Sequence, residues 1–65
     1  MLDKWGKTKS QWEEEADTFL LNWKNAMSRY PTKNEVIQEC IEFNEPPYNT
    51  QEYGETLWKY MQAYL

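Results

Sequence analysis

The feature that most constrains this chain is a heavy apolar stripe between residues 10 and 30. Its members recur at steps of three and four residues, so they lie on one side of a helix with about 3.6 residues per turn. They are Trp12, Ala16, Phe19, Leu20, Trp23, Met27 and Tyr30. A stripe this rich in aromatic rings must be covered, and the pattern predicts that two shorter helices cover it.

Size and composition are consistent with one small globular domain. The chain has 65 residues, near the lower limit for folding without disulfides or a metal. It contains four Trp, five Tyr and two Phe, and each buried aromatic side chain removes roughly 150–250 Å² from water. The mean hydropathy of −1.04 is misleading, because that kind of scale counts Trp and Tyr as polar.

The first helix has recognisable signals at both ends. Ser10 and Glu13 have the S-x-x-E spacing of a capping box. The acids of the first two turns suit the positive end of the helix dipole, so this acidic run is explained as helix chemistry. Pro31 is expected to end the helix, because the residue before a proline is pushed out of the α region. We therefore expect a helix over residues 10–30.

A second helix is predicted over residues 33–43. Thr32 and Glu35 form another capping box immediately after the proline. Cys40 lies in the middle of the apolar side of this helix. We therefore expect Cys40 to be a small buried hydrophobe rather than a reactive thiol.

A third helix is predicted over residues 50–64. Two adjacent prolines keep the segment 44–49 extended, and Asn49 or Thr50 is expected to cap the helix that follows. Gly54 inside this helix costs about 1 kcal/mol relative to alanine. We expect it to be tolerated because a neighbouring element approaches closely there.

Together these signals predict an all-α, three-helix domain over residues 10–65, preceded by an N-terminal arm of residues 1–9. Trp5 is expected to fold back onto the core, and the alternative is a binding anchor on a flexible arm. The first and third helices are expected to pack antiparallel around the second.

The residue inventory argues against an enzyme. There is no histidine and only one cysteine, which removes the commonest general base, the commonest metal ligand and any internal disulfide. Carboxylate pairs such as Glu35 with Glu39 and Glu52 with Glu55 are expected on solvated helix faces, which are unsuited to general acid–base work. We expect no catalytic residue, cofactor, metal site or small-molecule substrate.

A nucleic-acid-binding regulator is the alternative function. Residues 29–37 contain Pro31-Thr32 and Glu35-Val36, and they resemble the P-T-x-x-E-[IV] entry of helix-turn-helix segments in sigma-factor-like proteins. The match departs downstream, where NEPPYN replaces a glycine-containing turn. The outward face of the third helix also carries two acids against one base, an unfavourable sign for a groove lined with phosphates. The bases available to this alternative are Lys4, Lys7, Lys9, Arg29 and Lys33.

Two apolar residues favour a protein partner instead. Leu21 lies opposite the stripe of the first helix, and Trp58 lies at the edge of the stripe of the third helix. Interfaces are enriched in Trp and Tyr with charged rims. The predicted partner-binding residues are Leu21, Trp58, Leu65, Glu14 and Asp17. The alternatives are that a single exposed leucine has no role and that Trp58 belongs to the core.

The sequence therefore predicts a non-enzymatic protein–protein interaction module. The net charge is −4, and no signal peptide or apolar run of about 20 residues is present, so a cytosolic chain is expected. We expect a small accessory or regulatory protein that binds a surface of a larger cytosolic partner or forms a homodimer. It would resemble the acidic inhibitors that phages and mobile elements use. Imitation of DNA by the acidic faces is a special case of this hypothesis.

Overall fold

The computed structural model describes residues 2–65, which form three α-helices and one short 3-10 helix, with no strand among them. Helix α1 spans Lys9–Met27, α2 spans Lys33–Phe43 and α3 spans Gln51–Met61. A 3-10 helix, η1, follows at Gln62–Tyr64. The predicted all-α, three-helix fold is confirmed.

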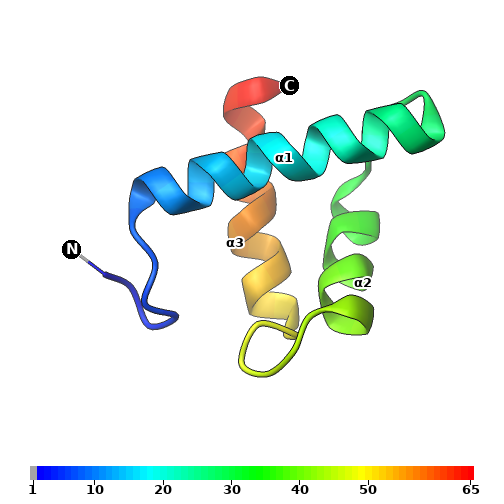
Figure 1. Ribbon diagram of the computed structural model, residues 1–65. Coiled ribbons are helices and arrows are strands. Elements are labelled where there is room, and N and C mark those ends of the chain that lie inside the picture. Colours follow the sequence, from blue (N-terminus) through cyan, green and yellow to red (C-terminus); the bar gives the residue numbers. More distant parts are fainter. Residues whose placement is uncertain (1) are drawn as a thin grey trace.

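Helices α2 and α3 lie side by side and run in opposite directions, and α1 lies across this pair (Figure 1). The expected antiparallel packing of the first and third helices around the second is therefore wrong. Gly54 allows α2 and α3 to pack closely, because a Cβ atom at this position would lie 2.7 Å from Cα of Ile37. The backbones of α2 and α3 thus approach too closely for any side chain at position 54, as expected for this glycine.

Threonine side chains cap the start of all three α-helices. The Thr32 hydroxyl accepts from the N–H of Glu35, whose carboxylate accepts in return from the N–H of Thr32 at 2.9 Å. Helix α2 therefore begins where its capping box predicts. For α3, the cap is Thr50 rather than Asn49, and its hydroxyl accepts from the N–H of Tyr53 at 3.1 Å.

Helix α1 begins and ends earlier than expected. Its capping box is formed by Thr8 and Gln11, with reciprocal bonds of 3.2 and 2.7 Å, and Ser10 lies inside the first turn. At the other end Ser28 adopts a left-handed conformation with φ of 61°, and its N–H donates to the carbonyl of Lys24 at 2.8 Å. The helix is therefore closed by a left-handed cap before Pro31 is reached.

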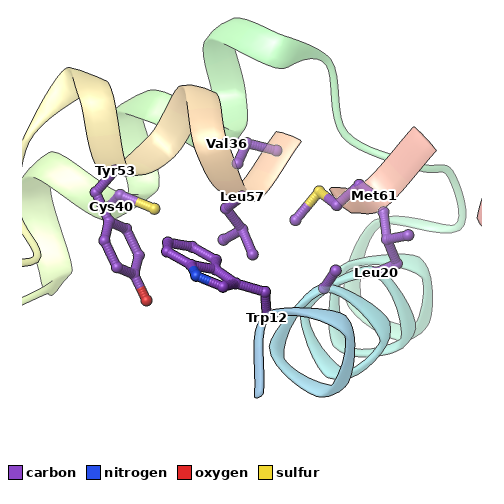
Figure 2. Packing of buried hydrophobic residues seen from close by; sticks show 8 residues of the cluster. Trp12, Leu20, Val36, Cys40, Tyr53, Leu57 and Met61 are labelled. Atoms are coloured by element: carbon purple, nitrogen blue, oxygen red, sulfur yellow. The ribbon is translucent and has the colours of Figure 1, made fainter. Parts of the chain in front are cut away.

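The buried core lies where α1 crosses the helix pair (Figure 2). Its members are Trp12, Ala16, Leu20, Val36, Cys40, Tyr53, Leu57 and Met61. The Trp12 ring extends from α1 toward Leu57 (Figure 2), and it is 1% exposed. Phe19 and Trp23 belong to the same stripe but are only partly buried. In the second half of the stripe Leu20 is buried, but Met27 and Tyr30 are 54% and 47% exposed, so the expectation that the whole stripe is covered is wrong.

The N-terminal arm packs against the core, as expected for Trp5. The Trp5 ring makes edge contacts with Trp12 and Tyr53, at centroid distances of 5.6 and 5.4 Å. Its indole N–H donates to the carbonyl of Pro47 at 3.3 Å. The carboxylate of Asp3 accepts from the indole N–H of Trp12. These contacts join the arm both to α1 and to the connection between α2 and α3.

Candidate functional site

The described residues offer little for catalysis or metal binding. Among residues 2–65 no three or more potential metal-ligating side chains form a group, and none of the helices is long and apolar enough to cross a membrane. Cys40 is buried, and burial raises the pKa of its thiol to about 11, with the charges of Glu15 and Glu39 adding to the effect. A thiol with such a pKa is a poor nucleophile near neutral pH.

A partly buried polar network fastens the arm to the domain. The Tyr53 hydroxyl donates to the Glu15 carboxylate and lies 2.7 and 2.6 Å from its two oxygens. The Lys7 ammonium donates to the same carboxylate at 2.5 Å and to the Tyr53 oxygen at 2.7 Å. It also lies 4.4 Å from the centroid of the Trp12 ring. Burial, and then the Glu15 carboxylate, raise the pKa of Tyr53 far above its usual value. Each polar group of the network is satisfied by another, so the network serves structure.

Ion pairs engage four of the five bases on which the nucleic-acid alternative depends. The pairs are Lys4 with Glu52, Lys7 with Glu15, Arg29 with Glu35 and Lys33 with Glu55. The fifth base, Lys9, is exposed and has no ion-pair partner within residues 2–65. Duplex binding requires positive charge gathered on one face, whereas each of these four bases has an acid beside it.

The Arg29–Glu35 pair is the best defined of these interactions. Two guanidinium nitrogens donate to the two carboxylate oxygens at 2.7 and 2.6 Å. Hydrogen bonding to Arg29 lowers the pKa of Glu35 to about 2, and the backbone N–H of Thr32 adds to this effect. The motif that resembles a helix-turn-helix entry therefore serves as a cap. Residues 44–50 then form a longer connection to α3 than the three- to four-residue turn of that motif.

The structure does not bring the five predicted partner-binding residues together. Leu21 is 59% exposed and lines one hollow with Asp17, whereas Glu14 lines a different hollow on α1. Trp58 is partly buried and packs against the core. Leu65 is 51% exposed at the end of the chain. Two of the five residues thus share a surface, and Trp58 is where the core alternative places it.

The hollow that contains Leu21 has a volume of about 180 Å³ and is bounded by α1, Tyr30 and Tyr64. We call this the Leu21 surface. Its lining residues are Asp17, Leu20, Leu21, Lys24, Tyr30 and Tyr64. Tyr30 and Tyr64 are 47% and 43% exposed, so Leu21 is one member of an apolar cluster rather than an isolated leucine.

A second apolar hollow lies on another flank of α1 and has a volume of about 320 Å³. We call this the Trp23 surface. Its lining residues are Phe19, Asn22, Trp23, Ala26, Met27 and Glu39. The rings of Phe19 and Trp23 are stacked, with centroids 5.9 Å apart and planes 8° apart, and Met27 is 54% exposed.

Periodicity predicts core positions for Phe19, Trp23 and Met27, because it shows which side of a helix is apolar but not how much of that side is covered. The relative lengths of the helices carry the missing signal. At 1.5 Å per residue, α1 with 19 residues is about 28 Å long. Two helices packed side by side, with axes about 8–10 Å apart, cover only about 20 Å of it. One end of the stripe must therefore extend past the helix pair, as Figure 1 shows for the C-terminal end of α1.

Comparison with protein-family models, with curated proteins and with solved structures finds no match for this chain.

Proposed function

We propose that this protein is a non-enzymatic protein–protein interaction module, a small accessory or regulatory protein that binds a surface of a larger cytosolic partner. The observation that carries the proposal is the Trp23 surface. Stacked Phe19 and Trp23 rings and the exposed Met27 side chain surround one hollow at the end of α1 that passes beyond α3 (Figure 1). Aromatic residues and methionine are the types enriched in interface cores, and Trp is the commonest hot spot.

The stability of the free domain does not explain how Trp23 is placed. Its indole N–H is enclosed, and no acceptor for it lies within residues 2–65. An enclosed donor without a partner costs about 1–3 kcal/mol. The ring is also partly exposed, so it contributes less burial than the fully covered Trp12. A partner that covers the exposed part of the ring would add the burial that the free domain lacks.

The lining of the hollow indicates the chemistry of the partner. Glu39 is its charged member, and this carboxylate belongs to none of the salt bridges among residues 2–65. A volume of about 320 Å³ is at the low end of the range for small-molecule sites, about 300–1,000 Å³. The surface therefore suits a bulky apolar side chain of a protein, with a lysine or arginine beside it to pair with Glu39.

The experiment compares Trp23→Ala with Phe43→Ala as baits for affinity capture from the native host, followed by binding measurements with the purified partner. Phe43 is a suitable control because it is 72% exposed and does not line this hollow. Loss of a Trp hot spot costs about 2 kcal/mol or more, which is roughly 30-fold in affinity. We expect that loss for Trp23→Ala and less than about a twofold change for Phe43→Ala.

Charge reversal at the rim tests the chemistry of the partner. Glu39→Lys should weaken binding, and cross-linking should locate an apolar residue next to a lysine or arginine of the partner in the hollow. The proposal is wrong if the purified partner binds both the Trp23→Ala and the Glu39→Lys variants as tightly as it binds the wild-type chain.

A further inference from the structure

We propose that the Leu21 surface is a self-association interface, in which two copies of the chain pair α1 against α1 in antiparallel orientation across a two-fold axis. This inference goes beyond the proposed function. It concerns a different flank of α1 and a second copy of the same chain rather than a larger partner.

The shape of the Leu21 surface is self-complementary. Leu21 projects from the side of α1 opposite Trp12 and is 59% exposed. Beside it lies the hollow of about 180 Å³ bounded by Tyr30 and Tyr64. A two-fold interface joins the same patch on both subunits, so it must be self-complementary. A protruding leucine next to a hollow meets this requirement, because each copy places its leucine in the hollow of the other.

Two oppositely charged residues flank Leu21. Asp17 and Lys24 both line the hollow, and neither takes part in a salt bridge among residues 2–65. The Lys24 ammonium instead lies 4.8 Å from the centroid of the Tyr30 ring. Seven residues separate Asp17 from Lys24, about 10.5 Å along the helix axis, so they are too far apart to pair with each other.

Antiparallel pairing satisfies both charges at once. The midpoint between positions 17 and 24 falls between Leu20 and Leu21, the apolar centre of the surface. A two-fold axis at this point places Asp17 of each copy opposite Lys24 of the other, which gives two ion pairs around the two leucines. A parallel pair would instead place Asp17 opposite Asp17. Charge complementarity therefore selects both the second copy and its orientation.

The available area sets the expected strength. A specific interface needs about 1,000 Å² in total, or about 500 Å² from each copy. This is roughly one ninth of the 4539 Å² of accessible surface of the chain. An interface at the small end of the range predicts a weak dimer, with a dissociation constant in the micromolar range.

Charge reversal tests the arrangement by sedimentation equilibrium of the full chain over a range of concentrations. Asp17→Lys and Lys24→Asp each place like charges opposite one another at two symmetry-related points, so each should weaken the dimer by about tenfold or more. The double variant Asp17→Lys/Lys24→Asp restores the pairing and should recover the wild-type affinity. An equimolar mixture of the two single variants should associate as well, because only the heterodimer pairs opposite charges.

Two further variants separate this surface from the rest of the molecule. Leu21→Asp should abolish the dimer, whereas Leu2→Asp, at a leucine that is 62% exposed on the arm, should leave it intact. Trp23→Ala should also leave it intact, so failure of this inference is distinguishable from failure of the proposed function. Circular dichroism confirms that each variant is folded. The inference is overturned if the wild-type chain stays monomeric at millimolar concentration. It is also overturned if the mixture of the two single variants associates no more tightly than either variant alone.

Discussion

The two halves of α1 belong to one apolar stripe but have different surroundings. Trp12 and Ala16 in the first half are 1% and 0% exposed, whereas Phe19 and Trp23 in the second half are only partly buried. The first half faces α3 and is covered by the arm, whereas the part of the second half that follows the buried Leu20 extends beyond α3 (Figure 1). Helical periodicity therefore determines the direction in which a side chain points, and the neighbouring elements determine whether it is covered.

Electrostatics differ between the two halves in the same way. Beside the first half, the Lys7 side chain is 15% exposed and is enclosed by Glu15, Tyr53 and the Trp12 ring. Beyond the second half, the Arg29 side chain is 53% exposed where it pairs with Glu35. Solvent screens an exposed pair much more than a partly buried one. We therefore expect the first half to contribute most of the stability and the second half to be free for binding.

The largest effect is expected from replacing the tryptophan of each half in turn. Trp12→Ala removes a fully buried ring and should lower the free energy of unfolding by about 3–5 kcal/mol. This is most of the stability of so small a domain. Trp23→Ala removes a partly exposed ring whose N–H has no acceptor within residues 2–65. It should cost only about 1 kcal/mol. Urea unfolding followed by circular dichroism measures both changes.

This prediction tests the comparison between the halves directly. Equal losses of stability for the two variants would show that the second half is as firmly covered in solution as the first half, and the Trp23 surface would lose its basis.

A smaller effect is expected from two lysines of the arm. Lys7→Ala removes a partly buried ammonium with a carboxylate, a hydroxyl and an aromatic ring around it. It should cost about 1–2 kcal/mol. Lys4→Ala is the matched control, because Lys4 pairs with Glu52 where the two side chains are 57% and 63% exposed. Its cost should stay below about 0.5 kcal/mol.

Thermal unfolding of the two lysine variants gives the comparison. If Lys4→Ala is as destabilising as Lys7→Ala, the network around Glu15 does not hold the arm in the way described.

The smallest effect is expected from Glu35, which pairs with Arg29 beyond the second half of α1, and it concerns stability at acid pH. The pKa of Glu35 is lowered to about 2 in the folded chain, from an ordinary value of 4.5. A folded-state pKa below the unfolded value contributes stability that is full above pH 4.5 and is lost as the pH falls toward 2. Glu35→Gln should therefore make the stability less sensitive to pH in this window, whereas Glu42→Gln on the same helix should not. Unfolding curves recorded between pH 2 and pH 6 measure the slope, and an unchanged slope in Glu35→Gln would contradict this assignment.

Local signals in the sequence predict most of the elements. Thr32 and Glu35 mark the start of α2 because a capping box uses groups only three residues apart. The same logic fails for α1, because two boxes overlap there and the chain uses the one at Thr8 and Gln11 rather than the one at Ser10. The site is less predictable than the elements. Leu21 is found because it breaks the stripe, whereas Trp23 follows the stripe and is indistinguishable from a core residue by pattern alone.

Residue patterns along the chain are enough to predict that this protein is helical, where its helices lie to within a few residues and which side of each is apolar, and its composition excludes histidine chemistry. These properties depend on neighbours along the chain. Three other properties depend on contacts between distant segments and require the folded chain. Helix α1 lies across the other two helices, and one end of its apolar stripe is left uncovered. Four of the five bases considered for nucleic-acid binding are paired with acids. The backbones of α2 and α3 approach closely at Gly54. A pair of helices packed that closely is too narrow to cover the whole length of α1.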